Sequence, residues 1–250
     1  MLLLIDIGNS RIKWGTFEGE QLEPSQAMTH SEWSIESCSN AFASVGRPQR
    51  ILVSNVGGER AGEVVTRVAQ DRWQLAPQFI QSTTAAAGIT NAYPQPANLG
   101  VDRWLAMIAA YASYRQAVCV VSVGTAATID GVAADGQHLG GLIIPGPDLM
   151  VDSLLKNTSD IAQRAKQGTV GAGLFADNTL GAIRQGSAHA VAALVERAFV
   201  AMRERLQMTP RLVLTGGAAA SVGALIQLDH TTLNDAVLRG LTVIARESGP

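Results

Sequence analysis

Short apolar runs that end at a turn recur along the chain. They lie at residues 2–5, 50–54, 117–123 and 211–215, and Gly, Asn or Asp follows each of them. Brief apolar runs bounded in this way are typical of buried strands. After the second run, residues 61–69 place apolar side chains at the spacing of one helix face. This alternation of strands and helices predicts an α/β fold.

Hydrophobic periodicity and turn residues indicate the remaining elements. We expect helices at residues 34–43, 102–115, 147–155, 179–198 and 235–246, and strands at 15–23, 78–81, 126–131 and 139–146. Residues 85–99 are rich in Asn and Pro and are expected to form a loop. Residues 171–176 have the glycine spacing of a dinucleotide fingerprint, but no apolar strand precedes them, so we reject that assignment.

The N-terminal stretch LLLIDIGNSRIKWG combines a strand, a carboxylate and a tight turn. Asp6 ends the buried run, and a buried carboxylate is unfavourable unless a cation or another partner offsets its charge. The turn Gly8–Ser10 permits close backbone approach. Ile12 and Trp14 then alternate with polar residues, which predicts the second strand of a hairpin. The unit is either a phosphate clamp or an ordinary hairpin whose Asp caps its own turn.

The clamp interpretation resembles the first phosphate-binding loop of the superfamily that holds acetate kinase, sugar kinases, actin and heat-shock chaperones. A second copy of the pattern lies 116 positions further on, where Gly124 corresponds to Gly8 and Gly131 to Gly15. Internal duplication explains such a repeat. We therefore predict two duplicated actin-like, ribonuclease H-like halves, residues 1–115 and 116–250, with a nucleotide cleft between them. The Gly pair at 216–217 fits an adenosine-binding surface or a simple strand-to-helix turn.

The tetrapeptide Gly100–Arg103 stands at the start of a predicted helix. Asp102 there is either a favourable charge near the helix N-terminus or a general base that projects into a cleft. Arg103 beside it is suited to holding an anionic group.

Composition excludes several classes of function. The net charge of −2 leaves no electrostatic footprint for nucleic acid. The two cysteines are far apart, which indicates buried small side chains in a reducing cytoplasm. No run approaches the roughly 20 apolar residues of a membrane span, and the N-terminus is unlike a signal peptide. We find no Walker A loop, no Cys/His metal spacing and no nucleophile elbow, and we assign no chemistry to the four histidines.

Together the motifs resemble the type III pantothenate kinases, the family that includes the Bvg accessory factor proteins. Its marks are DIGNSRIKWG at 6–15, GVDR at 100–103, GTAATID at 124–130, GGLIIPG at 140–146, and NT with AIRQG within 178–186. The resemblance implies ATP-dependent phosphorylation of the primary hydroxyl of pantothenate, the first step towards coenzyme A, by a homodimer.

The resemblance also implies roles for single residues. It assigns the ATP phosphates to Asp6, Ile7, Gly8, Asn9, Ser10, Arg11, Ile12 and Lys13, with Thr125 as a further ATP contact. It makes Asp102 the proton acceptor and assigns pantothenate contacts to Tyr93, Gly100, Val101, Asp102, Arg103 and Thr179. Mg2+ is expected near Asp6, bound through water. Tyr93 fits equally well as a packing residue of a lid.

One position departs from the family pattern. Ser122 stands where the family usually has an Asp that binds a monovalent cation such as potassium or ammonium. A hydroxyl is a neutral and weaker ligand than a carboxylate. We expect the protein to bind that cation poorly or to work without it.

Two alternatives remain at this stage. The first is another kinase or a phosphatase of the same superfamily, against which the GVDR tetrapeptide argues because it offers both a base and a carboxylate anchor. The second is a regulatory protein of the Bvg accessory factor kind, which the near-neutral charge disfavours as a direct DNA binder. The presence of both Asp6 and Asp102 favours an enzyme.

Overall fold

The computed structural model describes residues 1–165 and 173–247. The chain divides into two compact units, Met1–Arg115 with Asp235–Pro250, and Gln116–Asn234. Each unit has its own sheet and hydrophobic core. Residues 171 and 172 of the rejected dinucleotide pattern lie outside the described residues. Over the ranges described, every helix is too short or too polar to cross a membrane.

The sheet of the first unit has β1 (Leu2–Ile7) at its centre. β1 pairs antiparallel with β2 (Arg11–Glu18), as the N-terminal pattern predicts, and it also pairs parallel with β5 (Arg50–Asn55). The outer strands are β3 (Gln21–Leu22) and β4 (Gln26–Thr29), which pair with β2, and β6 (Gln78–Phe79), which pairs with β5.

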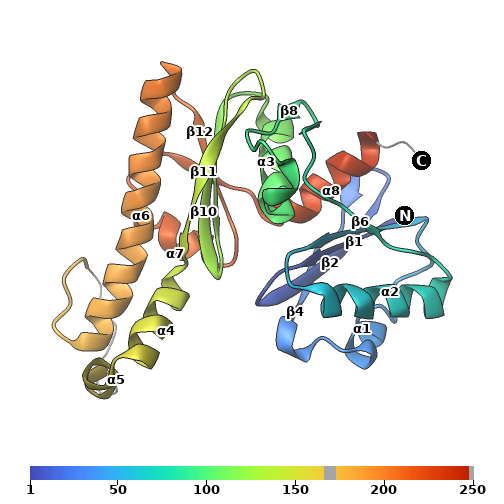
Figure 1. Ribbon diagram of the computed structural model, residues 1–250, viewed down its shortest axis with the longest axis horizontal. Coiled ribbons are helices and arrows are strands. Elements are labelled where there is room, and N and C mark those ends of the chain that lie inside the picture. Colours follow the sequence, from blue (N-terminus) through green and yellow to red (C-terminus); the bar gives the residue numbers. More distant parts are fainter. Residues whose placement is uncertain (166–172, 248–250) are drawn as a thin grey trace. The chain divides into compact units, whose positions relative to one another are not determined.

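Alternation along β1 gives the sheet two different faces. Leu3, Ile5 and Ile7 pack against α1 (Ile35–Ala41) and α2 (Glu59–Trp73), which lie together on one side of the sheet (Figure 1). Leu4 points to the opposite face, where it joins side chains of α3 (Val101–Tyr114) and α8 (Ala236–Glu247). Asp6 has the same parity as Leu4, so it also faces α3 and α8.

The expected loop at 85–99 contains short elements that the sequence did not reveal. β7 (Ala85–Ala86) and β8 (Ile89–Thr90) form a small hairpin, and η2 (Pro96–Asn98) precedes α3. A further 3-10 turn, η1 (His30–Glu32), follows β4.

The second unit repeats the strand pattern of the first. β10 (Ala126–Val132) pairs antiparallel with both β9 (Val118–Val123) and β11 (His138–Pro145), while β12 (Arg211–Thr215) runs parallel to β9 and to β13 (His230–Thr232). The strand orders are β3-β2-β1-β5-β6 and β11-β10-β9-β12-β13. Because corresponding neighbours have the same relative direction, the predicted duplication of the α/β fold is confirmed.

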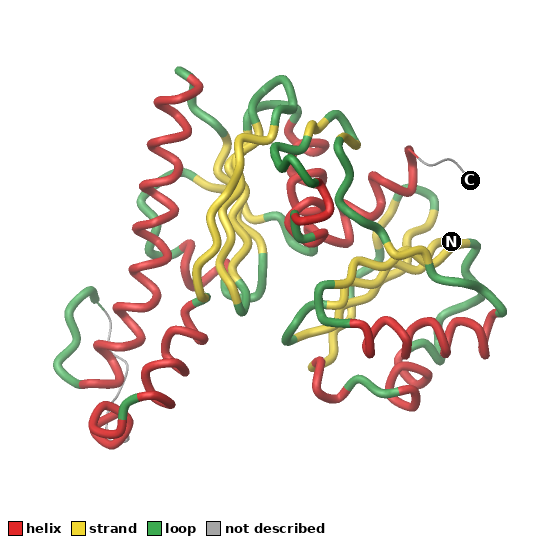
Figure 2. Tube along the Cα trace, in the orientation of Figure 1, coloured by secondary structure: helices red, strands yellow, loops and turns green. Residues whose placement is uncertain are grey.

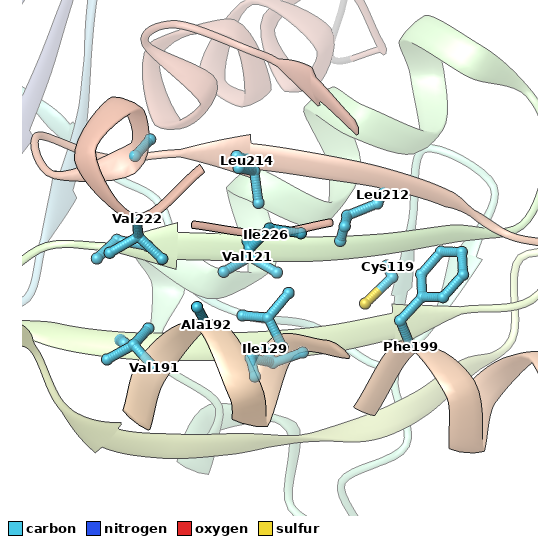
Figure 3. Close-up of a cluster of buried hydrophobic side chains, with 14 of the residues drawn as sticks. Cys119, Val121, Ile129, Val191, Ala192, Phe199, Leu212, Leu214, Val222 and Ile226 are labelled. Atoms are coloured by element: carbon cyan, nitrogen blue, oxygen red, sulfur yellow. The ribbon is translucent and has the colours of Figure 1, made fainter. Parts of the chain in front are cut away.

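One face of this second sheet carries the longest helix, α6 (Thr179–Leu206) (Figure 2). Phe199 and Val191 of α6 pack over Cys119 and Ile129 of the sheet, and Val222 of α7 (Ala219–Gly223) completes the cluster (Figure 3). The helices α4 (Pro147–Asn157) and α5 (Ser159–Ala165) lie between β11 and α6 in the chain. Both cysteines are buried and free, as expected.

The last helix differs from the sequence expectation, which placed residues 116–250 in one half. By element order α8 is the counterpart of α3, since each follows the last strand of its sheet. In the structure α8 belongs to the first unit, where Leu238 and Leu241 share a cluster with Leu105 of α3. Gly240 permits this approach, because a Cβ there would lie 2.8 Å from the Leu105 Cβ.

Candidate functional site

The turn between β1 and β2 is closed by its own backbone. The Gly8 N–H donates to the Arg11 carbonyl at 3.0 Å, and a Cβ at Gly8 would lie 2.9 Å from the same oxygen. Asn9 and Ser10, at the tip of the turn, are exposed. The predicted hairpin therefore has a tight glycine turn with an accessible tip.

A histidine supports this turn from outside it. His30 Nδ1 lies 2.6 Å from the Gly8 carbonyl oxygen, and the His30 N–H donates to the Ser10 carbonyl at 2.9 Å. Gly57 lies against both, because a Cβ there would stand 2.6 Å from the Gly8 oxygen and from His30 Cε1. His30 could not be identified from the sequence, since no local pattern connects residues 8, 30 and 57.

Asp6 is the buried carboxylate of the site. Strand register places Lys13 of β2 and Ser54 of β5 on either side of it, so these three side chains share one face of the sheet. Within the described part of the chain, Asp6 Oδ1 and Ser54 Oγ have no hydrogen-bond partner of acceptable geometry. Orphaned buried oxygens of this kind indicate a place for a cation or an ordered water.

The pKa of Asp6 is raised from 3.8 to about 7, first by burial and then by the Asp102 carboxylate. The nearby Ser54 hydroxyl and the Lys13 ammonium limit this rise. The two carboxylates named by the sequence, Asp6 and Asp102, thus lie within electrostatic range of each other in one unit.

Asp102 lies in the first turn of α3. Its Oδ1 is 2.7 Å from the position that a Cβ on Gly100 would take, so a side chain at 100 would displace the Asp102 carboxylate from this position. Gly100 is the N-cap residue, and its carbonyl accepts from the Trp104 N–H at 3.1 Å. Val101 is buried in the cluster that α3 forms with α8.

Arg103 and Tyr93 form a second polar pair. Arg103 is 5% exposed, and its Nη1 donates to the Tyr93 hydroxyl at 3.1 Å. The Tyr93 N–H donates to Asn91 Oδ1 at 3.0 Å, and Asn91 Nδ2 donates to the Thr83 carbonyl at 3.1 Å. The loop before α3 therefore holds Tyr93 against the guanidinium by a chain of hydrogen bonds.

The remaining predicted site residues lie in the second unit. Thr125 is exposed in the turn between β9 and β10, and its carbonyl accepts from the Gly146 N–H at 2.8 Å. Thr179 is the first residue of α6, directly after its N-cap Asn178, whose side chain accepts from the Gly181 N–H at 2.9 Å. Ser122 lies between Thr128 of β10 and Thr215 of β12, so a row of hydroxyls replaces the charged row around Asp6.

Asp235, which begins the last segment of the first unit, was not among the residues predicted from the sequence. Its Oδ1 accepts from Lys13 Nζ at 3.0 Å, and its Oδ2 accepts from Ser25 Oγ at 2.8 Å. Partial burial would raise the pKa of Asp235, but these two partners and Arg239 outweigh it and hold the pKa below its usual value. No local signal reveals this contact, because Lys13 and Asp235 are 222 positions apart.

Comparisons with known proteins agree with this arrangement. A family model described as type III pantothenate kinase matches residues 2–201. A type III pantothenate kinase of Nitrosococcus oceani is 37% identical over 254 residues, which cover 99% of this chain and 95% of that protein. Another, from Aromatoleum aromaticum, is 37% identical over 249 residues, with coverage of 99% and 98%.

Two solved structures show the same fold. A candidate Baf family transcriptional activator from Campylobacter jejuni is 24% identical, with a TM-score of 0.59 over 98% of both chains. A candidate 2-dehydro-3-deoxygalactonokinase from Sinorhizobium meliloti is 14% identical, with a TM-score of 0.65 over the full length of both. Since the family model and the full-length relatives agree, this chain belongs to the type III pantothenate kinase family.

Proposed function

We propose that this chain transfers the γ-phosphoryl group of ATP to the primary hydroxyl of pantothenate, the first step of coenzyme A synthesis. The observation that carries the proposal is the proximity of Asp6 and Asp102 within one unit, beside a tight glycine turn. Phosphoryl transfer needs mainly positioning and charge stabilisation, together with a group that receives the hydroxyl proton. Family membership supports the choice of substrate.

The β1–β2 hairpin, residues Asp6 to Lys13, is the proposed cradle for the ATP phosphates. Its glycine turn allows the phosphates to approach the backbone, and Asn9 and Ser10 at the exposed tip supply short polar side chains. Lys13 supplies positive charge on the strand that leaves the turn.

Mg2+ fits the orphaned buried oxygen of Asp6. In the ranges that the structure describes, no three His, Cys, Asp or Glu side chains are grouped to hold a metal. Mg2+ would therefore be held mainly by the ATP phosphates and water, with Asp6 behind them. When bound, the ion neutralises charge on the phosphates, and its own charge favours the ionised form of Asp6.

Asp102 is the proposed proton acceptor. As the pantothenate hydroxyl oxygen bonds to the γ-phosphorus, the bond from that phosphorus to ADP breaks and the hydroxyl proton moves to the Asp102 carboxylate. The Arg103–Tyr93 pair is suited to the substrate carboxylate, because a guanidinium can donate two parallel hydrogen bonds to it. Gly100 and Val101 shape the start of α3, and Thr179 is a further proposed pantothenate contact.

In the second unit we propose Thr125 as a further ATP contact and Ser122 as a position that binds no monovalent cation tightly. The neutral row of Thr128, Ser122 and Thr215 supports the second proposal, because hydroxyls attract potassium less strongly than a carboxylate does. Turnover is expected to persist in buffer free of potassium and ammonium. A collapse of activity in that buffer would contradict this part of the proposal.

The proposal includes a homodimer in the cytoplasm. Exposed apolar side chains on β11 and α4 support self-association. Two buried free cysteines are compatible with a reducing compartment.

A coupled assay of ADP release tests the activity. Purified protein with ATP, Mg2+ and pantothenate is expected to release ADP only when pantothenate is present, and Asp102→Asn is expected to lose this turnover. Asp71→Asn is the control, because Asp71 is exposed and pairs with Arg67 of its own helix, away from the proposed site. Absence of pantothenate-dependent turnover by folded protein, or full activity of Asp102→Asn, would overturn the assignment.

A further inference from the structure

Asp235 stands where the chain returns from the second unit to the first. Unit two ends at Asn234, and Asp235 precedes the first turn of α8, where its carbonyl accepts from the Arg239 N–H at 2.9 Å. The backbone of Asp235 is left-handed, with φ at 53°, a conformation that Asp tolerates better than most residues. Both carboxylate oxygens are engaged by side chains from distant strands or loops.

The partners of Asp235 belong to the hairpin and to the segment that follows it. Lys13 lies on β2, next to Asp6 in the sheet register. Ser25 directly precedes β4, which pairs with β2 along Lys13 and its neighbours. Asp235 therefore joins the phosphate hairpin and the β4 segment to the start of α8 through one carboxylate.

An ion pair here restricts a flexible side chain. Lysine has four rotatable bonds, and a lysine that becomes ordered only when a ligand binds loses considerable conformational entropy, which weakens binding. The Lys13 and Asp235 side chains are 31% and 22% exposed, so the pair is half-buried and less screened than a surface pair. A Lys13 ammonium held by Asp235 in this way lies beside Asp6 without forming a hydrogen bond to the Asp6 carboxylate.

We propose that Asp235 is a positioning residue that orients the Lys13 ammonium towards the phosphates of ATP, with Ser25 fixing the carboxylate. The inference rests on the proposed function, because it takes the β1–β2 hairpin as the site of the ATP phosphates. Asp235 itself need not touch either substrate. Its loss should therefore affect ATP and leave the interaction with pantothenate unchanged.

The test measures both Michaelis constants and kcat for a set of variants. Asp235→Asn is expected to raise KM for ATP roughly tenfold, as the loss of a charge-assisted hydrogen bond does. KM for pantothenate should stay as in the native enzyme. Asp235→Glu, which keeps the carboxylate, should restore part of the ATP effect, and Ser25→Ala should give a smaller rise. Asp71→Asn controls for the loss of an Asp–Arg pair elsewhere in the unit.

A double variant separates positioning from structure. If Asp235 acts through Lys13, Asp235→Asn should add no further rise in KM for ATP once Lys13→Ala is present. Additive effects in the double variant, or an equal rise in both Michaelis constants, would overturn the inference. If Asp235→Asn fails to fold, Asp235→Glu and Ser25→Ala provide the test. The inference requires the carboxylate to be fixed in one geometry. An unchanged KM for ATP in both variants would therefore contradict it. Lack of turnover in the native protein would instead reject the proposed function.

Discussion

Burial of Asp6 disfavours the ionised carboxylate that its proposed role beside Mg2+ needs. Burial and the neighbouring Asp102 carboxylate raise its folded pKa to about 7, compared with 3.8 for an Asp side chain in water. Between these values the folded protein binds more protons than the unfolded chain, so the stability due to Asp6 falls as pH rises. Above pH 7 the penalty for keeping the ionised carboxylate buried is fully present.

This sign leads to a stability prediction for Asp6→Asn. Without nucleotide or Mg2+, we compare the unfolding free energy of the variant with that of the native protein. This difference should increase in favour of the variant by about 3 kcal/mol from pH 5 to pH 8, because Asn has no charge to bury. Urea titrations at the two pH values measure the difference. Asp71→Asn, an exposed position, should show no comparable gain, and a pH-independent difference for Asp6→Asn would contradict the raised pKa.

Gly57 contacts the β1–β2 turn from a distant part of the sequence. A Cβ at 57 would stand 2.6 Å from the Gly8 carbonyl oxygen and from His30 Cε1, so it must displace the β1–β2 turn or its supporting histidine. Gly57→Ala should weaken binding of ATP by roughly tenfold, within the range of overpacking effects. Calorimetric titration with an ATP analogue measures this change. Gly46→Ala, whose Cβ would meet only a Met1 side-chain atom at 3.9 Å, should bind as the native protein does.

At the scale of elements, two helical glycines allow a matched comparison. Gly240 of α8 packs onto the Leu105 backbone of α3, and its Cβ would lie 2.8 Å from the Leu105 Cβ. Gly186 of α6 would place its Cβ in open space. Gly240→Ala should therefore reduce the unfolding free energy by about 1–3 kcal/mol, whereas Gly186→Ala should increase it by about 1 kcal/mol.

Denaturant unfolding of both variants measures these changes. Equal signs for the two substitutions would contradict the close α3–α8 contact, because helix propensity alone favours alanine at both positions. The comparison also tests the assignment of α8 to the first unit, since Leu105 belongs to that unit.

The elements that could be predicted from the sequence are those that local patterns define. The hairpins around Gly8 and Gly124 were predictable because strand, turn and return strand are local patterns. β13 and the β7–β8 hairpin were missed, because two or three residues carry no measurable period. The packing of α8 on α3 was also missed, since element order favours the second half and only the three-dimensional contact favours the first.

The residues of the candidate site likewise divide into those that local patterns indicate and those that only tertiary contacts reveal. Asp6 and Asp102 were identified from their positions at a strand end and a helix start. His30 and Asp235 were not, because their partners lie 22 and 222 positions away and no local pattern connects them. Residues that motifs assign to the proposed site are thus visible in one sequence, whereas residues that contact them only in the tertiary structure are not.

At the scale of the whole molecule, the proposed homodimer rests on exposed apolar side chains of the second unit. Ile143 of the edge strand β11 is 60% exposed, Leu142 is 44% exposed, and Leu149 and Leu154 of α4 are also exposed. We therefore propose that these side chains, together with β11 as an edge strand of its sheet, form an interaction surface. We take a second copy of this chain as the partner that covers this surface.

The substitution Ile143→Asp tests this assignment. A charge buried at an interface is strongly unfavourable, so the variant should sediment as a monomer at concentrations where the native protein sediments at about twice the 26.2 kDa chain mass. Met208→Asp replaces another exposed apolar side chain of the second unit outside β11 and α4, and it should leave the dimer intact. A native protein that sediments as a monomer would reject the homodimer. Dissociation of both variants would show that the interface is not confined to β11 and α4.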